Sequence, residues 1–546
     1  DKGLKDPENG VRLMKDIPDL GETLKKASGM YAFALWNKIE KKLYLARDPF
    51  GEKPLYYGFN NEVFLFGSEL KSLRQYPNFE AQLDKKAVND FLKYSYIPAP
   101  KSIYENISKL QPGKYLTFNT IENKIDIHSH WCIDHEIQKD FKLEQKKINF
   151  PDEMEGLIIN SIREQLISDV PLGAFLSGGV DSSLIVSLMQ KISSKPVKTF
   201  SIGFKRESLD EAIYAKKIAN HLKTDHRELY VSDEDALNVV KILSDIYDEP
   251  FADSSQIPTY LVSKMARDDV TVCISGDAGD EIFGGYNRHL FIKRYWKKIS
   301  ITPLILRKII GFILLKIPER FLESIYSYLP RKLKIPNLKE KLVKFSIAIT
   351  SKDFNELYER LISVWQNPNE CLKSDFQFEI CHTKAEYLES NEEDFQNAML
   401  RDIKGYLNGD ILVKVDRAAM HNSLETRIPF LNKKIFKAAY FLPSNEKINN
   451  GTTKKILREI LFKYVPKELI ERPKSGFAVP LDDWLRGPLK KWGENLLRKD
   501  LLEEQGIFDA EKILSMWSDH QNFKHNYKNE LWNILVLQNW LINNNK

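Results

Sequence analysis

Cysteine is scarce in this 546-residue sequence, and its spacing carries no motif. The four cysteines, Cys132, Cys273, Cys371 and Cys381, form no CxxC pair and no dense framework. This spacing argues against a small secreted protein stabilised by disulfides, because such proteins hold many closely spaced cysteines. We therefore expect a cytoplasmic protein in which each cysteine is a small, buried, hydrophobic residue.

Several other signals are absent from the sequence. It opens with no basic-then-apolar signal and contains no run of 18 or more uncharged apolar residues, which argues against secretion and against a membrane span. It shows no internal repeat. It also lacks a GxxxxGK[ST] loop, the motif of many enzymes that cleave the γ-phosphate of ATP. Any ATP chemistry must therefore use a different loop.

Acidic residues are scarce in residues 286–345. This segment holds fifteen Lys or Arg but only Glu319, Glu323 and Glu340, so its net charge is +12 in a chain whose net charge is +5. The simpler interpretation is a solvated helical face, because runs of charge are usually solvated. Basic helices of this kind can also contact an anionic membrane surface or a partner enzyme. We expect no nucleic acid as a partner.

The residues that are present indicate a large α/β protein with more than one domain. The composition is that of a globular protein, with 42% hydrophobic and 29% charged residues, and the length exceeds what one core organises. Residues 28–70 alternate apolar and polar positions, which predicts strands, and the polar, Lys-rich stretch up to about residue 150 is interpreted as a linker zone. We place a boundary there, giving domains 1–150 and 151–546, the latter with a helical insertion at about 286–400.

The second predicted domain begins with a strand, a loop and a helix. Residues 172–176 are apolar, residues 177–183 read SGGVDSS, and a helical pattern follows to Lys191. Further strands are predicted at residues 197–202 and 270–275, with helical patterns between them. A repeated order of strand and helix predicts a parallel sheet with helices on its faces.

The SGGVDSS loop has the residues that a pyrophosphate-binding turn requires. Gly178 and Gly179 let backbone N–H groups approach phosphate oxygens, and the helix that follows directs its positive N-terminal dipole at the same place. Asp181 would repel a bare phosphate, so we predict that it binds Mg²⁺, which bridges the two negative groups. Hydroxyl donors are supplied by Ser177, Ser182 and Ser183.

With Leu176, this loop resembles the signature of the ATP pyrophosphatases, enzymes that cleave ATP between its α- and β-phosphates. Further strings resemble the glutamine-hydrolysing asparagine synthetases within that group, and they occur in the right order over most of the chain. The strings are GMYAFA at 29–34, RDPFGEKPLYY at 47–57, TFSIG at 199–203, SGDAGDE at 275–281, GGY at 284–286, LVKVDRA at 412–418, LETRIPFL at 424–431 and ERPKSGF at 471–477.

The resemblance implies a fold and a reaction. The fold is α/β, with a partial four-layer αββα glutaminase domain followed by an ATP-pyrophosphatase domain that has a parallel twisted sheet and a large helical insertion. The reaction is the ATP-dependent amidation of L-aspartate to L-asparagine. A β-aspartyl-AMP intermediate forms as pyrophosphate leaves, and nitrogen from glutamine or ammonia then displaces AMP. A homodimer is an open option for the assembly.

The resemblance also implies which residues surround the adenosine part of ATP. These are Leu176, Ile202, Ser275 and Gly276. Leu176 and Ile202 are equally expected in the hydrophobic core, and we expect both roles together.

The resemblance to this family also implies catalytic roles for several charged residues. Asp181 and Asp280 correspond to Mg²⁺ ligands. Asp277 occupies a position where many relatives carry a glutamate that is important for forming the aspartyl-adenylate. Lys454 matches a lysine that stabilises charge on the α-phosphate, and the neighbouring Lys455 is a rival with the same chemistry.

The resemblance leaves the nitrogen donor open. The family's glutaminase half starts with a cysteine nucleophile, and that cysteine, the glutamine-binding arginine and the Asn-Gly-Glu stretch do not occur here. Because the sequence starts at Asp1 within a recognisable domain, we expect it to be incomplete; as written, it would use ammonia. The alternatives are a related adenylating ligase or cyclase, such as a β-lactam synthetase, with a decayed glutaminase domain, and a silent binding homologue.

Overall fold

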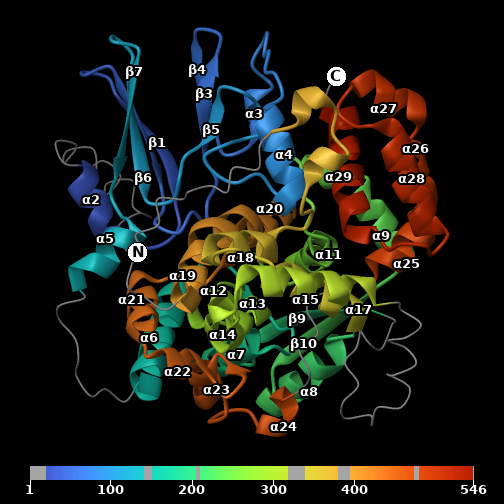
Figure 1. The fold of residues 1–546 in the computed structure, drawn as a ribbon. Coiled ribbons are helices and arrows are strands. Elements are labelled where there is room, and N and C mark those ends of the chain that lie inside the picture. The colour runs from blue at the N-terminus through green and yellow to red at the C-terminus, as the bar shows by residue number, and fades with distance from the viewer. Residues whose placement is uncertain are drawn as a thin grey trace.

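The computed structural model (Figure 1) describes residues 20–140, 150–204, 210–317, 338–378, 394–471 and 479–544. The N-terminal part contains two antiparallel sheets, and the C-terminal part is built on a parallel sheet surrounded by helices. This mixed α/β architecture is the predicted fold class. Within the described ranges, no helix is both long enough and apolar enough to cross a bilayer.

The two N-terminal sheets enclose a shared core. Leu45 and Leu116 of one sheet pack in the same cluster as Leu55 and the aromatic residues of the other. The helix α2 (Leu20–Lys26) lies beside the first sheet. The strand orders are β1 (Ala32–Asn37), β2 (Lys42–Arg47), β6 (Lys114–Asn119), β7 (Lys124–Ser129) and β4 (Val63–Gly67), β3 (Tyr56–Asn60), β5 (Ile107–Lys109).

The polar stretch before residue 150, which we interpreted as a linker zone, instead contains β5, β6 and β7 and the helix α5 (Ile133–Asp140). The lysines of this stretch misled the interpretation. β6 buries Leu116 and Phe118, and β7, in which Ile127 is exposed, is a strand because it pairs with β6. Residues 141–149 lie outside the described ranges.

The C-terminal sheet has five parallel strands in the order β10, β9, β8, β11, β12. The strands predicted at 172–176, 197–202 and 270–275 correspond to β8 (Leu172–Phe175), β9 (Lys198–Phe204) and β11 (Val272–Ile274). From β8 the chain proceeds outward through β9 to β10 (Asp225–Val231) and then returns to the other side of β8. The direction of winding therefore reverses between β8 and β11, where open α/β sheets usually bind ligands.

Helices cover this sheet and extend beyond it. Most of the described part of residues 286–400 is helical, as its periodicity predicts, whereas residues 363–378 hold only two short 3-10 helices. Cys273 and Cys371 are buried, and Cys132 is half-buried. Cys381 lies outside the described residues. The helices used below are α6 (Phe150–Gln165), α7 (Val180–Ile192), α8 (Ala212–Leu222), α12 (Gly279–Phe283), α13 (Asn287–Phe291), α14 (Lys297–Ile301), α15 (Leu304–Lys316), α17 (Leu338–Ile349), α19 (Asp394–Arg401), α20 (Leu412–His421), α21 (Lys433–Phe441) and α23 (Lys455–Leu461).

The N-terminal sheets and the C-terminal part are joined by ion pairs from α20. Lys53 Nζ lies 2.6 Å from Asp416 Oδ1, and Arg417 donates to the Ser68 carbonyl at 2.6 Å and to Glu69 at 3.2 Å. Asp416 and Arg417 belong to the LVKVDRA string, and Lys53 belongs to RDPFGEKPLYY. Two of the strings that carried the resemblance therefore meet at this interface.

Glu155 of α6 links three helices of the C-terminal part through hydrogen bonds. Its carboxylate accepts from Lys191 of α7 at 2.9 Å, from Lys463 at 2.8 Å and from the Tyr464 hydroxyl. Burial alone would raise the pKa of Glu155, but these three donors lower it to about 2. Lys463 and Tyr464 follow α23 directly, so this carboxylate fixes α23 against α6 and α7.

We expect Glu155 to make the stability of the protein sensitive to acid. Its pKa is lower in the folded chain than in the unfolded chain, so its contribution is complete above about pH 4.5 and is lost as the pH falls towards 2. Both lysines are partly exposed and screened by solvent, so we expect this contribution to be about 1 kcal/mol. Urea unfolding of wild type and Glu155→Gln between pH 7 and pH 3 measures it. A constant stability difference across this range would contradict the assignment.

Candidate active site

The loop that follows β8 forms one side of the site. Leu176 donates its backbone N–H to Phe200 at 2.9 Å, and α7 begins at Val180. Ser177 Oγ and Ser182 Oγ lie 3.0 Å apart, while Ser177 Oγ also accepts from the Gly179 amide at 3.3 Å. Gly178 has a φ of +74°, a left-handed conformation that favours glycine. The loop is thus a tight turn that opens directly into a helix N-terminus.

The loop that follows β11 forms the opposite side. Ser275, Gly276 and Asp277 leave β11, and α12 begins at Gly279. A Cβ atom at Gly276 would lie 2.7 Å from the Ser182 amide nitrogen, because the two loops touch at this point. Ala278, between Asp277 and α12, has a φ of +68°, which is costly for a residue other than glycine. Strain of this kind is typical of functional loops.

Because backbone atoms surround Gly276, we expect Gly276→Ala to push the two loops apart. The substitution should raise the KM for ATP by roughly tenfold, since overpacking of this kind costs on the order of 1–3 kcal/mol. Initial rates of pyrophosphate release at varied ATP concentration measure the change. Gly156→Ala is the control, because the added Cβ meets no atom within 4 Å beyond its chain neighbours and the backbone of its own helix. Equal KM values for the two variants would contradict the close contact.

A buried lysine links the two loops. The Lys454 ammonium pairs with Asp181, next to the SGG turn, and lies 2.6 Å from Oδ1 of Asp280 on α12. Only 5% of Lys454 is exposed. Burial would lower the pKa of this ammonium, but Asp181 and Asp280 raise it above its ordinary value. The group therefore carries a fixed positive charge between two carboxylates.

The backbone separates Lys454 from its neighbour Lys455. Lys454 has a φ of +53° and precedes α23, whereas Lys455 is the first residue of that helix. The Lys455 ammonium pairs with Glu446 at 2.9 Å and with Glu459 at 3.5 Å. Of the two rival lysines, Lys454 is thus the one that contacts the predicted metal ligands.

Asp277, in the β11 loop, lies near the charge of Lys414, which belongs to a group of charged residues from more distant parts of the chain. Its carboxylate accepts from the Ser275 hydroxyl, and burial raises its pKa despite that bond and the charge of Lys414. Lys414 Nζ lies 2.8 Å from Asp253 Oδ2. Burial would raise the pKa of Asp253, but Lys414 lowers it to about 2, while burial and Asp253 raise the pKa of Asp410.

The group of Lys414, Asp253 and Asp410 was not identified from the sequence. Lys414 stands in the quoted LVKVDRA string, but neither aspartate falls in a string that we singled out. An aspartate followed by a lysine four residues later is common on the exposed surface of helices. The sequence therefore does not show that Asp410 and Lys414 belong to a buried group.

The other residues that we predicted for the nucleotide site are buried. Leu176 and Ser183 are fully buried, and Ile202 and Ser275 are almost so, which fits the expected core role of the two apolar residues. Ser183 Oγ has no hydrogen-bond partner among the described residues. Residues 472–478, which include most of the ERPKSGF string, lie outside the described ranges.

The carboxylates fit a magnesium ion that is shared with a nucleotide. No group of three or more His, Cys, Asp or Glu that could hold a metal occurs in the described part of the chain. Mg²⁺ is commonly held by one or two carboxylates together with substrate phosphates, and Asp181 and Asp280 supply such a pair beside the phosphate-type turn. Both also converge on one cation, the Lys454 ammonium.

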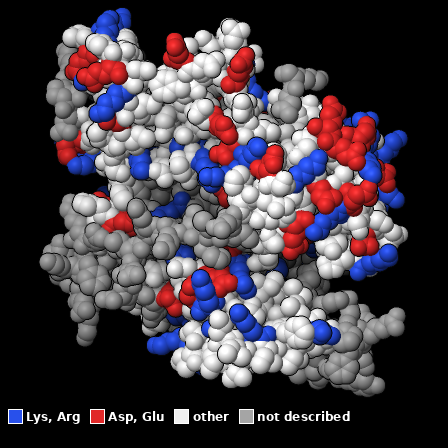
Figure 2. Space-filling model, turned by 45° about the horizontal axis from the view of Figure 1, so that its top comes forward, with Lys and Arg blue, Asp and Glu red and all other residues white. Residues whose placement is uncertain are grey.

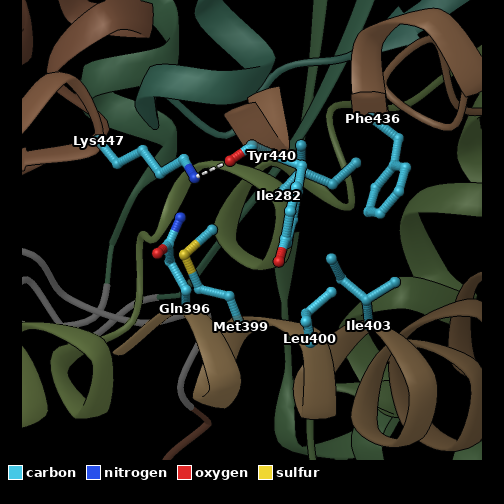
Figure 3. A pocket seen from close by; sticks show the side chains of 8 residues that line it. All are labelled: Ile282, Gln396, Met399, Leu400, Ile403, Phe436, Tyr440 and Lys447. Atoms are coloured by element: carbon cyan, nitrogen blue, oxygen red, sulfur yellow. Dashed lines mark hydrogen bonds between the residues drawn. The ribbon is translucent and has the colours of Figure 1, made fainter. Parts of the chain in front are cut away.

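A small apolar pocket lies behind this site (Figure 3). Ile282 of α12, Leu400 of α19 and Phe436 of α21 point into it, and Lys447 beside it donates to the Tyr440 carbonyl at 2.8 Å. No carboxylate lines the pocket, so its chemistry does not suit Mg²⁺ or a substrate amine. The pocket is part of the hydrophobic packing of α12 against its neighbouring helices.

Comparison with known proteins identifies two matches to family models. Residues 153–542 match the model described as asparagine synthase, and residues 11–131 match the glutamine amidotransferase domain. The chain is 32% identical over 526 residues to asparagine synthetase [glutamine-hydrolyzing] 1 of Bacillus subtilis, covering 95% of this chain and 78% of that protein. It is 28% identical over 529 residues to a putative asparagine synthetase of Mycobacterium tuberculosis, covering 95% and 77%. A putative asparagine synthetase of Methanocaldococcus jannaschii is 38% identical over 272 residues, covering 49% of this chain and 52% of its own.

Proposed function

Because the chain belongs to the asparagine synthase family, we propose that it makes L-asparagine from L-aspartate at the expense of ATP, through β-aspartyl-AMP. The observation that carries the proposal is the position of Lys454 between Asp181 and Asp280, where the β8 and β11 loops meet. Glutamine is the proposed nitrogen donor, since residues 11–131 match an amidotransferase domain.

The first proposed step joins aspartate to AMP. A β-carboxylate oxygen of aspartate attacks the α-phosphorus, and the bond from that phosphorus to the pyrophosphate oxygen breaks. Negative charge grows on the α-phosphate oxygens during this step, and we propose that the buried Lys454 ammonium stabilises that charge. The amides of the Ser177–Gly179 turn and the N-terminus of α7 would hold the pyrophosphate.

Asp181 and Asp280 would hold Mg²⁺, which neutralises phosphate charge when it is bound. We propose that Asp277 helps to position the aspartate. Its carboxylate is fixed by Ser275 and faces the charge of Lys414. Holding the two reactants in one geometry is a large part of the catalysis expected for such a site.

The second proposed step forms the amide. The lone pair of ammonia attacks the acyl carbon of the adenylate, the bond from that carbon to the AMP oxygen breaks, and a proton is lost from nitrogen. The ion pairs Lys53–Asp416 and Arg417–Glu69 join the amidotransferase part to the synthetase part, and we propose that ammonia passes from the first part to the second.

The experiment follows an oxygen isotope. Purified protein is incubated with L-aspartate labelled with ¹⁸O in its carboxylates, ATP, MgCl₂ and either glutamine or ammonium chloride. We expect asparagine, AMP and pyrophosphate in equal amounts, with one ¹⁸O in each AMP. Formation of ADP and phosphate, or AMP without label, would refute the adenylate. Labelled AMP without asparagine would instead indicate a related adenylating ligase, and no nucleotide binding would indicate a silent homologue.

A further inference from the structure

The helix α15 (Leu304–Lys316) exposes its apolar residues to solvent. A helix of a globular protein normally turns such residues towards the core. Here the exposed fractions run from 46% to 74%, and Ile301 of the preceding helix α14 is 78% exposed. The exposed apolar residues of α15 are Ile305, Leu306, Ile309, Ile310, Phe312, Ile313 and Leu315.

The buried side of α15 is its polar and small-residue side. Arg307 is 5% exposed and donates to the carbonyls of Thr302 at 2.9 Å and Ile349 at 3.1 Å. Gly311, one turn later, is also buried, and its carbonyl accepts from Ser346 Oγ of α17 at 2.9 Å. Figure 1 shows α15 and α17 side by side at the surface. These contacts fix the orientation of α15, so its apolar face is held outward by the fold.

The charges of the segment that carries this face, residues 286–316, are all positive. On the face shown in Figure 2, acidic and basic side chains intermingle. By contrast, residues 286–316 hold eight Lys or Arg and no Asp or Glu. Of these, Lys297, Lys298, Lys308 and Lys316 are exposed, and Lys316 Nζ lies 4.4 Å from the centre of the Phe312 ring. An apolar face edged by cations matches a surface of acyl chains and anionic headgroups.

We propose that α14 and α15 dock the protein on an anionic phospholipid surface. The 13 residues of α15 span about 20 Å, less than the roughly 30 Å of a bilayer core, so the helix would lie in the interface and not cross it. A second copy of the chain is a poor occupant, because pairing two such faces would bring together two segments 286–316, each of which has only basic charges. This inference does not depend on the proposed reaction.

Vesicle flotation tests the proposal with the full chain. The probes are vesicles of phosphatidylcholine alone and of phosphatidylcholine mixed with phosphatidylglycerol. We expect binding only to the mixed vesicles, weakened by salt. Ile309→Asp and Phe312→Asp should each reduce the binding constant at least roughly tenfold, and Lys308→Gln and Lys316→Gln roughly fivefold each.

Matched controls exist elsewhere on the surface. Ile39→Asp and Ile121→Asp change residues that are 94% and 75% exposed, and both should leave vesicle binding unchanged. Lys217→Gln is matched to Lys316→Gln, because Lys217 Nζ also lies over an aromatic ring of its own helix, Tyr214, at 5.6 Å. Aspartate-dependent pyrophosphate release should be the same in all of these variants, which shows that they are folded.

Four results would overturn the proposal. They are equal binding to both kinds of vesicle, binding that ignores salt, loss of binding in the control variants to the same extent, and no binding by wild type. In the last case, a change of mass for Ile309→Asp in size-exclusion chromatography with light scattering would assign the face to a second copy. A lower melting temperature without a change of mass would assign it to another part of the same chain.

Discussion

Lys454→Met is expected to lower the rate of aspartate-dependent pyrophosphate release by on the order of a thousandfold. The ammonium is the buried cation shared by the β8 and β11 loops, and its removal takes away a preorganised charge that water cannot replace there. Losses of about a hundredfold to a thousandfold are typical when one such donor is removed. The measurement is a coupled pyrophosphate assay with L-aspartate, ATP, MgCl₂ and ammonium chloride. The use of ammonium makes the assay independent of glutamine hydrolysis.

Lys455→Met is the matched control for this prediction. Its ammonium pairs with Glu446 and Glu459 and does not contact either predicted metal ligand, so we expect less than about a twofold change in rate. Thermal melting of both variants should accompany the assay, because Lys454→Met leaves two carboxylates facing each other. A comparable loss in the two variants would show that Lys454 acts only by supporting the fold around α23.

The position of the SGG turn was predictable because its residues have strong local preferences. Gly178 adopts the left-handed conformation that the loop needed, and an apolar strand and a helix flank it as their patterns predicted. The choice between Lys454 and Lys455, in contrast, could not be made from local preferences. Two adjacent lysines have the same local chemistry, and only the φ of +53° at Lys454 and the start of α23 at Lys455 direct one of them to the site.

Elements whose stability comes from tertiary contacts were the ones that sequence patterns missed. The strand β12 (Glu425–Arg427) has three residues, two of them charged, and exists because it pairs with β11. The strand β10 contains several charged residues and, among the strands that the structure describes, pairs with β9 alone. The pairing of Lys414 with Asp253 likewise depends on α20 packing against α11 (Gln256–Arg267), the helix that begins just after Asp253, which no local pattern specifies.

Asp181→Asn and Asp280→Asn are each expected to raise the Mg²⁺ concentration needed for half-maximal pyrophosphate release by roughly tenfold or more, and to lower the rate at fixed Mg²⁺ about a hundredfold. Each substitution removes one of two anionic ligands and leaves the Lys454 ammonium to pair with the other. Because Lys454 is buried and the carboxylate is partly buried, their attraction is screened less than in water, and the remaining carboxylate becomes a poorer ligand for a second cation. Rates measured over a titration of MgCl₂ at saturating ATP report both quantities.

Glu281→Gln is the control that distinguishes a metal ligand from a neighbouring carboxyl group of the same helix. Glu281 follows Asp280 in α12 but accepts from the Tyr286 hydroxyl, and burial raises its pKa to about 7. Glutamine keeps an acceptor for that hydroxyl, so the Mg²⁺ requirement should change less than about threefold. If Glu281→Gln raised the Mg²⁺ requirement as much as Asp280→Asn, the metal would be held by a different carboxylate set from the pair that converges on Lys454. If excess Mg²⁺ restored neither aspartate variant, Asp181 and Asp280 would act by positioning Lys454 and not by binding the ion.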